Sequence, residues 1–324
     1  MVKLEDIKKS IGPDLKALNK IIEDTLQSDC ALMNSIVSKY LVTKGKQLRP
    51  ILVLLSGRLF GGITDNVLYS GAAIEMLHNA SLIHDDVIDR SKERHGAATI
   101  NSVWDNHVAV LVGDFFVSGA LACASKAQDF NIMKSLSRLG RDLSLGEINQ
   151  FDTARSRNIN KNAYFEIIGR KTASLFTSCV EVGGLAAGAK PEQLTAIKRY
   201  ADLLGLCFQI KDDTFDYYND PAIGKPTGND LREGKVTLPL IYALSKEDAE
   251  EHDEMNRLVH KEVLTTDEIE RLIEFAKANG GIDYAYNEMK KLRDEAEQEL
   301  EVYGDGDTID SLKAIFNFVI EREI

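Results

Sequence analysis

The chain has 324 residues, with 39 lysines and arginines against 51 aspartates and glutamates, which gives a formal net charge of −12. Hydrophobic residues make up 44% of the sequence and charged residues 28%, and this balance excludes wholesale disorder. The acidic excess argues against a partner such as nucleic acid or a membrane surface, because either would need a basic face.

Apolar residues recur at helical spacing along the chain, and only 6 prolines interrupt the pattern. One such run near the N-terminus contains Leu15, Leu18, Ile21, Ile22 and Leu26, and a later run contains Leu194, Ile197, Tyr200, Ala201 and Leu204. Glycines punctuate the chain at short intervals, and no low-complexity linker divides it. We therefore expect an all-α protein with a single domain over residues 1–324 and roughly ten or more helices.

The sequence favours a cytoplasmic protein without a transmembrane segment. The apolar stretch at residues 107–124 is short for a membrane span and contains Asp114, so we expect a buried helix there. The charged N-terminus lacks the apolar stretch of a signal peptide. The cysteines form no CxxC pair, which predicts neither a disulfide framework nor a zinc site and fits a reducing compartment.

The first chemical feature is a pair of aspartates at the end of an apolar segment that begins near Val67. On a helix, Asp85 and Asp89 lie one turn apart on the same face, and His78 falls close to that face. Two carboxylates at this spacing repel each other, so an ordinary helix avoids them. They become favourable beside Mg²⁺, which binds oxygen ligands and bridges carboxylate to phosphate.

A second aspartate cluster follows the apolar segment at residues 201–210. Gln209, Asp212, Asp213 and Asp216 have the i, i+3, i+4, i+7 spacing of one helix face. One DDxxD sequence alone is more typical of a solvated helix end. Two copies, each after an apolar helix, instead favour two facing carboxylate walls around a metal cluster.

Carboxylates alone do not bind an anionic substrate, so we also expect basic residues at the same place. Short glycine-bearing segments carry them, and a single such segment is more often a surface turn. The segments contain Lys46 and Arg49, Arg94 and His95, Arg170 and Lys171, Lys225, and Lys235. Arginine offers two parallel hydrogen bonds to a diphosphate, and lysine a compact charge. The GxxxxGK[ST] sequence is absent, which argues against ordinary nucleotide hydrolysis.

Together these segments resemble the trans-isoprenyl diphosphate synthase family, the polyprenyl synthetases. The resemblance covers nearly the whole chain and rests on several motifs in the family's order. They are GKQLRP at 45–50, DDVID at 85–89, Arg94, GEINQ at 146–150, GRKTASLF at 169–176, FQIKDDTFD at 208–216 and GKPTGNDLREGKVTLPL at 224–240. The resemblance implies an all-α isoprenoid synthase fold around a deep central cavity. It also implies a homodimer that joins isopentenyl diphosphate head to tail, in trans, to an allylic diphosphate such as farnesyl or geranylgeranyl diphosphate.

The resemblance also implies roles for individual residues. About three Mg²⁺ ions would be bound by Asp85, Asp89, Asp212 and, through water, Asp216. The allylic diphosphate would be held by Arg94, Lys171 and Lys225, with Lys235 nearby. The isopentenyl diphosphate would be held by Lys46, Arg49 and His78. Thr172 and Gln209 would line the reacting carbons and stabilise a carbocation, so the residues expected to be catalytic are Lys171, Thr172 and Gln209.

The expected chemistry begins when metal ions and basic residues neutralise the leaving diphosphate and the allylic C–O bond ionises. Excluding water protects the cation until the double bond of isopentenyl diphosphate attacks it. The departing diphosphate is the expected acceptor of the proton that is then lost.

One position departs from the family pattern. The family usually has two arginines before a glycine, whereas this chain has Arg94, His95 and Gly96. His95 therefore stands where an arginine to isopentenyl diphosphate is expected. Because a diphosphate favours the charged imidazole, we hypothesise that binding of isopentenyl diphosphate weakens as pH rises.

In this family, the residues four and five positions before the first aspartate motif control product length. They are Ser81 and Ala80 here, both small, and the motif lacks the two extra residues of many short-chain members. We therefore expect a long-chain polyprenyl diphosphate, of the kind used for a quinone side chain. A geranylgeranyl or farnesyl product is the alternative, since small residues also simply permit close helix packing.

Three other classes remain as alternatives. His84 and Asp85 form the dipeptide of HD-type phosphohydrolases, but these need further histidine ligands. A terpene cyclase would not need the residues expected to bind isopentenyl diphosphate. A non-catalytic subunit of a heteromeric synthase typically loses carboxylates from one motif, and both motifs are intact here.

Overall fold

The computed structural model describes residues 3–42, 45–94, 96–156, 159–218 and 227–322. It divides into two compact units, each built from separate stretches of sequence. Unit 1 comprises Met1–Gly140, Leu175–Lys198 and Val302–Ala314, and unit 2 comprises Arg141–Ser174, Arg199–Glu301 and Ile315–Ile324. The single domain expected over residues 1–324 therefore remains a prediction.

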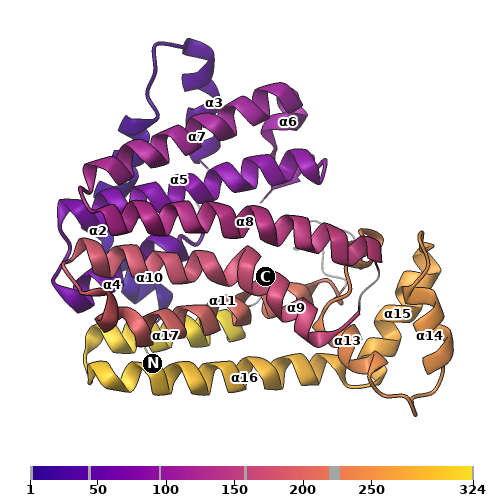
Figure 1. Ribbon diagram of the computed structural model, residues 1–324. Helices are drawn as coiled ribbons and strands as arrows, with labels where there is room; N and C mark the ends of the chain where they lie inside the picture. Colours follow the sequence, from indigo (N-terminus) through magenta and orange to yellow (C-terminus); the bar gives the residue numbers. More distant parts are fainter. Residues whose placement is uncertain (1–2, 43–44, 95, 157–158, 219–226, 323–324) are drawn as a thin grey trace. The chain divides into compact units, whose positions relative to one another are not determined.

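The described residues are mostly helical, with almost no strand, which confirms the predicted all-α class (Figure 1). The helices that lie within unit 1 are α1 (Leu4–Ser10), α2 (Gly12–Thr25), α3 (Ala31–Val42), α4 (Leu48–Phe60), α5 (Asp65–Ile88), α6 (Ile100–Val103), α7 (Asn106–Lys126) and the 3₁₀ helix η2 (Pro191–Leu194). Those within unit 2 are α9 (Lys161–Ile168), the π-helix η1 (Gly169–Ala173), α12 (Asn229–Arg232), α13 (Leu238–Leu244), α14 (His252–Val259), α15 (Thr266–Ala278) and α16 (Gly281–Leu300). The elements with residues in both units are α8 (Phe130–Ser156), α10 (Ser174–Ala186), α11 (Thr195–Phe215), η4 (Glu301–Tyr303) and α17 (Asp307–Glu321).

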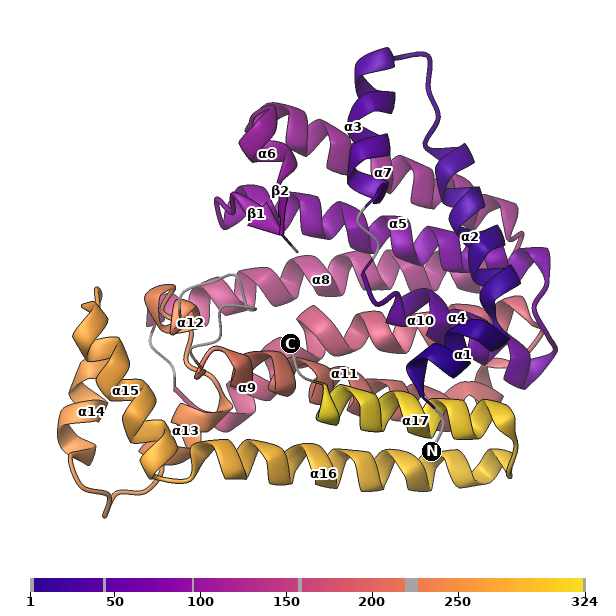
Figure 2. The same cartoon turned by 180° about the vertical axis from the view of Figure 1, so that it is seen from behind.

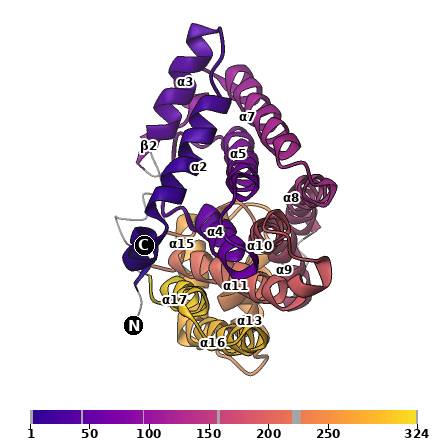
Figure 3. The same cartoon turned by 90° about the vertical axis from the view of Figure 1, so that its left-hand side faces the viewer.

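The core of unit 1 forms around α5, which packs against α2, α4 and α7 (Figures 1 and 3). The helix begins where the Thr64 hydroxyl accepts a hydrogen bond from the Val67 N–H, close to the predicted start. Glycines on α7 allow a close approach to α5: a Cβ on Gly113 would lie 2.2 Å from His84 Nε2. The core packing of α5 places the first aspartate motif at its C-terminal end. Two antiparallel strands of two residues each, β1 (Glu93–Arg94) and β2 (Ala97–Ala98), follow this motif (Figure 2).

Helix α7 contains the apolar stretch at residues 107–124. By length and composition alone it could cross a membrane, and 44% of its most apolar window is buried inside the structure. Its inner face, which includes Val112 and Phe116, is fully buried. Its outer face carries the exposed side chains of Val110, Leu111 and Leu121. The expectation of a buried helix therefore holds for one face only.

Unit 2 contains its own hydrophobic cluster, built mainly by α13, α14 and α15, with α16 packed along α13 (Figures 1 and 2). Fully buried members of this cluster include Leu240, Met255 and Leu272. The charged C-terminal part of the chain is thus amphipathic helix, with its polar residues on solvated faces. The four cysteines are free, as the sequence predicts.

Candidate active site

The first aspartate motif lies at the end of α5, in unit 1. The carbonyl of Asp85 accepts the Asp89 N–H at 2.8 Å, so the two residues are one helical turn apart, as predicted. The Asp85 side chain is half-buried and that of Asp89 is exposed. The intervening Asp86 differs from both, because its carboxylate is buried and accepts a hydrogen bond from Arg94 Nε at 2.9 Å, while Arg94 Nη2 lies 2.8 Å away.

The carboxylates of Asp85 and Asp89 are suited to a divalent cation in an open site. Among the described residues, no group of three or more histidine, cysteine, aspartate or glutamate side chains stands at metal-binding distance. A closed protein cage is therefore not formed within this part of the chain. Mg²⁺ commonly binds through one or two carboxylates and takes its remaining oxygens from water and substrate phosphates. Asp85 and Asp89 are carboxylates of the kind that such a site uses, and their role as ligands remains a prediction.

The residues predicted to hold isopentenyl diphosphate also lie in unit 1. Lys46 is exposed just before α4, Arg49 is half-buried in the first turn of α4, and His78 is half-buried on α5. The Arg49 guanidinium lies 5.4 Å from the centre of the Phe176 ring. Burial raises the pKa of Glu75, and the nearby Arg49 charge opposes that shift. The structure thus places Glu75, which the sequence analysis did not single out, beside Arg49.

In unit 2, the predicted catalytic residues Lys171 and Thr172 lie on the π-helix η1. Single π-helical turns within longer helices are rare and are frequent at functional sites. The backbone of α11 comes very close to this turn, since a Cβ on Gly205 would lie 2.4 Å from the Cα atom of Ala173. On the other side of the π-turn, a Cβ on Gly146 of α8 would lie 2.8 Å from the backbone nitrogen of Lys171. Both glycines are therefore required for the position of the π-turn.

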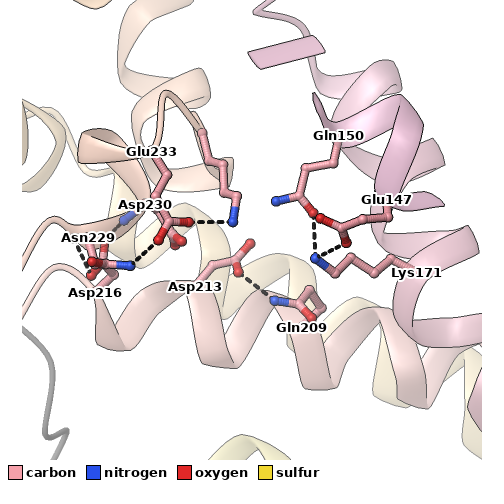
Figure 4. Close-up of polar contacts among 10 residues, drawn as sticks. Glu147, Gln150, Lys171, Gln209, Asp213, Asp216, Asn229, Asp230 and Glu233 are labelled. Carbon is pink, nitrogen blue, oxygen red and sulfur yellow. Dashed lines mark hydrogen bonds and ion pairs between the residues drawn. The ribbon is translucent and has the colours of Figure 1, made fainter. Parts of the chain in front are cut away.

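The Lys171 ammonium is held by two side chains of α8 (Figure 4). It donates to Gln150 Oε1 at 2.8 Å and lies 2.5 Å from Glu147 Oε2. The motif at 146–150 therefore has a physical role that the sequence analysis did not assign: its glycine permits the approach, and its glutamate and glutamine fix the ammonium.

Thr172 and Gln209 belong to a continuous hydrogen-bond chain between η1, α11 and α9. The Thr172 hydroxyl donates to Gln209 Oε1 at 2.7 Å. Gln209 Nε2 donates to Asp213 Oδ1 at 2.8 Å (Figure 4). The Tyr164 hydroxyl donates to the other oxygen of Asp213, Oδ2, at 2.5 Å. Thr172 and Gln209, both predicted to line the reacting carbons, are thus in direct contact, and Asp213 and Tyr164 extend the chain.

Burial and a second carboxylate shape the electrostatics of this chain. Burial raises the pKa of Asp213 well above its ordinary value, and the nearby Asp230 raises it further, while the hydrogen bonds from Tyr164 and Gln209 oppose the shift. Burial likewise raises the pKa of the Tyr164 hydroxyl, with a further contribution from Asp213. The hydroxyl is therefore a donor at neutral pH.

The other two aspartates of the second motif have separate partners. Asp212 is partly exposed and forms a hydrogen-bonded ion pair with Arg322, whose guanidinium also donates to the Phe208 carbonyl at 3.1 Å. Asp216 accepts backbone N–H groups at the start of α12, from Asn229 at 2.9 Å and Asp230 at 3.0 Å (Figure 4). The carboxylates that share one helix face in sequence thus differ in their surroundings.

A cavity of about 160 Å³ in unit 2 collects most of these groups. Its polar lining includes Lys171, Thr172, Gln209 and Lys235, all predicted from the sequence, together with Tyr164 and Asp213. Lys235 Nζ lies 2.5 Å from Glu233 Oε2. The apolar part of the lining includes Ile159, Ile167, Ile168, Val236 and Ile241. The cavity therefore combines a cation with a hydrocarbon wall.

The remaining predicted residues divide into two groups. Ala80, with 1% of its surface exposed, and the half-buried Ser81 lie on α5 in unit 1, and the Ser81 hydroxyl donates to the His78 carbonyl at 2.8 Å. His95 and Lys225 lie outside the described residues. The first motif belongs to unit 1 and the second to unit 2, and the expectation that their carboxylates face one another remains a prediction.

Sequence reasoning missed several members of the site. Asp213 was included in the second aspartate cluster, four residues after Gln209 on the same helix face, but was given no role of its own. Glu147 and Gln150 stood in a motif that was recognised but given no role. Tyr164 and Arg322 had no local signal, since each meets its partner across a large separation in sequence, 49 residues for Tyr164 and Asp213 and 110 residues for Arg322 and Asp212.

Comparison with known proteins agrees with this geometry. The family profile described as "Polyprenyl synthetase" matches residues 31–276. An all-trans-nonaprenyl-diphosphate synthase (geranyl-diphosphate specific) of Rhodobacter capsulatus is 32% identical over 98% of both chains. A crystal structure of polyprenyl synthase from Caulobacter crescentus, complexed with calcium and isoprenyl diphosphate, has a TM-score of 0.91 at 30% identity and covers 99% of this chain and 98% of that one. A geranylgeranyl pyrophosphate synthase from Bacteroides thetaiotaomicron has a TM-score of 0.84 at 33% identity, with both chains covered completely.

Fold, site and comparisons together define an all-α prenyltransferase. The chain belongs to the polyprenyl synthetase family, as the order of its motifs predicts.

Proposed function

We propose that this protein condenses isopentenyl diphosphate with an allylic diphosphate, in a head-to-tail trans reaction that requires Mg²⁺, and makes a long-chain polyprenyl diphosphate. The unit 2 cavity is the observation that carries the proposal. It places the Lys171 ammonium and the Thr172–Gln209 pair in one lining with five apolar side chains. An allylic diphosphate has the same two parts, an anionic head and a hydrocarbon tail.

Divalent ions would be held by Asp85, Asp89 and Asp212 and would supply electrostatic stabilisation of the leaving diphosphate. Asp216 is proposed to act only through water, which agrees with its hydrogen bonds to two backbone N–H groups. Lys171, fixed by Glu147 and Gln150, would bind the allylic diphosphate as a preorganised charge. Arg94, Lys225 and Lys235 are proposed to share that role.

The carbocation that ionisation produces requires electron-rich oxygens and the absence of water. Thr172 is buried, and its hydroxyl and the Gln209 amide oxygen are 2.7 Å apart in the cavity lining. A hydroxyl oxygen and an amide oxygen stabilise a cation through their lone pairs without forming a bond to it. Lys46, Arg49 and His78 are proposed to hold isopentenyl diphosphate, whose double bond attacks the cation. The released diphosphate then accepts the proton.

Small side chains on α5 support a long product. We assign the control of product length to Ala80 and Ser81, and we infer that a bulky residue at either position would block chain growth. The similar identity to a nonaprenyl and to a geranylgeranyl synthase means that overall likeness does not discriminate between product lengths. A quinone side chain is the proposed destination of the product.

We further propose that the protein is a cytoplasmic homodimer. The exposed apolar side chains on the outer face of α7, Val110, Leu111 and Leu121, support a contact with a second copy. Light scattering coupled to gel filtration should give twice the chain mass, and Leu111→Glu should shift the protein toward the monomer. A monomeric wild-type protein would contradict this assignment.

The test of the function uses the purified single chain, labelled isopentenyl diphosphate and farnesyl diphosphate, with Mg²⁺ or with EDTA. We expect labelled long-chain products with Mg²⁺ and none with EDTA. Products of geranylgeranyl length would support the shorter alternative. A chain that is inactive alone and active only with a second protein would favour the non-catalytic subunit.

The HD-type alternative is not supported by the position of His84. Its ring lies against Gly113 of α7, and its Nε2 atom is 3.2 Å from the Val110 carbonyl oxygen. It therefore serves helix packing. Release of inorganic phosphate without formation of a carbon–carbon bond would nevertheless support the HD-type phosphohydrolase alternative.

The role proposed for His95 has its own test. If the imidazole contacts isopentenyl diphosphate in its charged form, the KM for this substrate rises with pH more steeply than in His95→Arg. Identical pH dependence in the two proteins would show that His95 does not make this contact.

A further inference from the structure

The middle aspartate of each DDxxD motif is anchored by protein groups. In unit 1, Asp86 has 6% of its side chain exposed and is held by Arg94. In unit 2, Asp213 is buried, and both of its oxygens accept hydrogen bonds, from Tyr164 and Gln209. The first aspartates of the motifs, Asp85 and Asp212, are more accessible. The two middle carboxylates therefore have protein partners in place of solvent.

We propose that Asp213 and Tyr164 are positioning residues that fix the orientation of the Gln209 amide for the condensation. This inference rests on the proposed function, in which the Gln209 oxygen stabilises the carbocation. It gives Asp213 a role other than metal binding, and it gives Tyr164, which the sequence did not single out, a role in the reaction.

The orientation of the Gln209 amide depends on the partners of its two ends. An amide carries an acceptor oxygen and a donor nitrogen of nearly equal size, so its hydrogen-bond partners decide which end faces a given direction. Asp213 Oδ1 accepts the hydrogen bond of Gln209 Nε2 at 2.8 Å, and a carboxylate oxygen would not favour the amide oxygen in that place. The amide oxygen is consequently directed to the Thr172 side, where it accepts a hydrogen bond at 2.7 Å.

Tyr164 fixes the carboxylate in turn. Its hydroxyl donates to Oδ2 of Asp213 at 2.5 Å, so the two carboxylate oxygens have different partners and the group has one defined orientation. Tyr164 itself is held in place by α9, where its ring packs edge-on against Phe165 with ring centres 5.5 Å apart. A rotated Gln209 amide would present N–H groups to the carbocation, which would repel it.

The test is a double-mutant cycle between Tyr164→Phe and Gln209→Ala in the full-length enzyme. In the wild-type background, Tyr164→Phe should lower kcat about tenfold and change the KM values of both diphosphates less than about twofold. In the Gln209→Ala background, the same change should alter kcat less than about twofold, because the residue on which Tyr164 acts is absent. Equal effects in both backgrounds, or no effect of Tyr164→Phe in the wild type, would overturn the proposal.

Tyr217→Phe is the matched control. Tyr217 is also a buried tyrosine of unit 2, but its hydroxyl is hydrogen-bonded to Thr237 Oγ1 at 2.9 Å, whereas the Tyr164 hydroxyl donates to Asp213. It should lose a comparable amount of thermal stability and retain the wild-type kcat. A kcat loss as large as that of Tyr164→Phe would show that the effect is general to buried tyrosines and would contradict the assignment.

Asp213→Asn provides a second variant if Tyr164→Phe does not fold. Its amide keeps the size of the side chain but offers one acceptor in place of two, so kcat should fall and the effect should again depend on Gln209. Wild-type label transfer is measured in the same series. If the wild-type protein transfers no label, the proposed function is refuted. If it transfers label normally but the effects of the variants do not depend on Gln209, only the positioning role is refuted.

Discussion

Gly205→Ala tests whether the close approach of α11 to the π-turn is needed for activity. The added Cβ would lie 2.4 Å from the Cα and 2.9 Å from the Cβ of Ala173. Contacts below about 3 Å with backbone atoms are not relieved by rotating a side chain. The π-turn must therefore move, and with it Lys171 and Thr172.

Two effects of opposite sign set the size of the stability change. Alanine in place of a helical glycine stabilises the chain by about 0.5–1 kcal/mol. Overpacking against backbone costs about 1–3 kcal/mol, so we expect a net loss of up to about 2.5 kcal/mol and, for a chain of 324 residues, a fall in Tm of up to about 4 °C. A displacement approaching 1 Å at the Thr172–Gln209 contact should lower kcat by about 10–100-fold.

Gly140→Ala is the matched control, since Gly140 is also helical and an added Cβ there has no neighbour within 4 Å. Thermal unfolding and label transfer are measured for both variants. Gly140→Ala should be as stable as the wild type or more so, with normal kcat. If Gly205→Ala behaves in the same way, the close approach does not position the catalytic residues and the reasoning fails.

Three further predictions concern the metal, the fold and the product. Arg322→Gln removes the positive charge that neutralises Asp212. The affinity of the protein for Mn²⁺ in the presence of pyrophosphate, measured by calorimetry, should therefore rise about tenfold. An unchanged affinity would contradict this prediction. Burial raises the pKa of Glu181, but hydrogen bonds, chiefly from Lys198, outweigh it and lower the pKa. Glu181→Gln should therefore cost about 1–3 kcal/mol at neutral pH, and the cost should shrink as the pH falls through that lowered pKa; an equal loss at neutral and at strongly acidic pH would refute the assignment. Ala80→Phe should shorten the main product, and an unchanged length distribution would exclude the proposed wall.

Much of the fold could be predicted because its signals are local. The helix that carries Asp85 and Asp89 is apolar, begins close to Val67 and ends near Asp89, as expected from its sequence, and the structure adds its cap, Thr64. The same holds for α11, whose apolar stripe includes the fully buried Ile197 and Leu204. Where spacing and burial agree in this way, sequence periodicity is sufficient to place a helix and its motif.

The separate roles of the second motif could not be read from spacing. Asp212, Asp213 and Asp216 share one helix face, and only their partners distinguish them: Arg322, Tyr164 with Gln209, and the backbone at the start of α12. These partners come from distant segments, and their positions depend on tertiary packing.

The π-turn also has no sequence signature of its own. The segment from Gly169 to Ala173 is compatible with an ordinary helix by composition. The segment adopts i→i+5 geometry where it is in close contact with Gly146 and Gly205, which lie on two other helices. The sequence therefore predicted the identity of Lys171 and Thr172, whereas the way they are held emerged only from the structure.

The central claim is that this protein forms carbon–carbon bonds between two prenyl diphosphates. The most direct measurement follows, in one reaction with Mg²⁺, both the labelled isopentenyl units incorporated into hydrophobic product and the inorganic diphosphate released. We expect one diphosphate for each unit incorporated, and neither product when EDTA is present. Release of diphosphate or phosphate without labelled hydrocarbon product would contradict it.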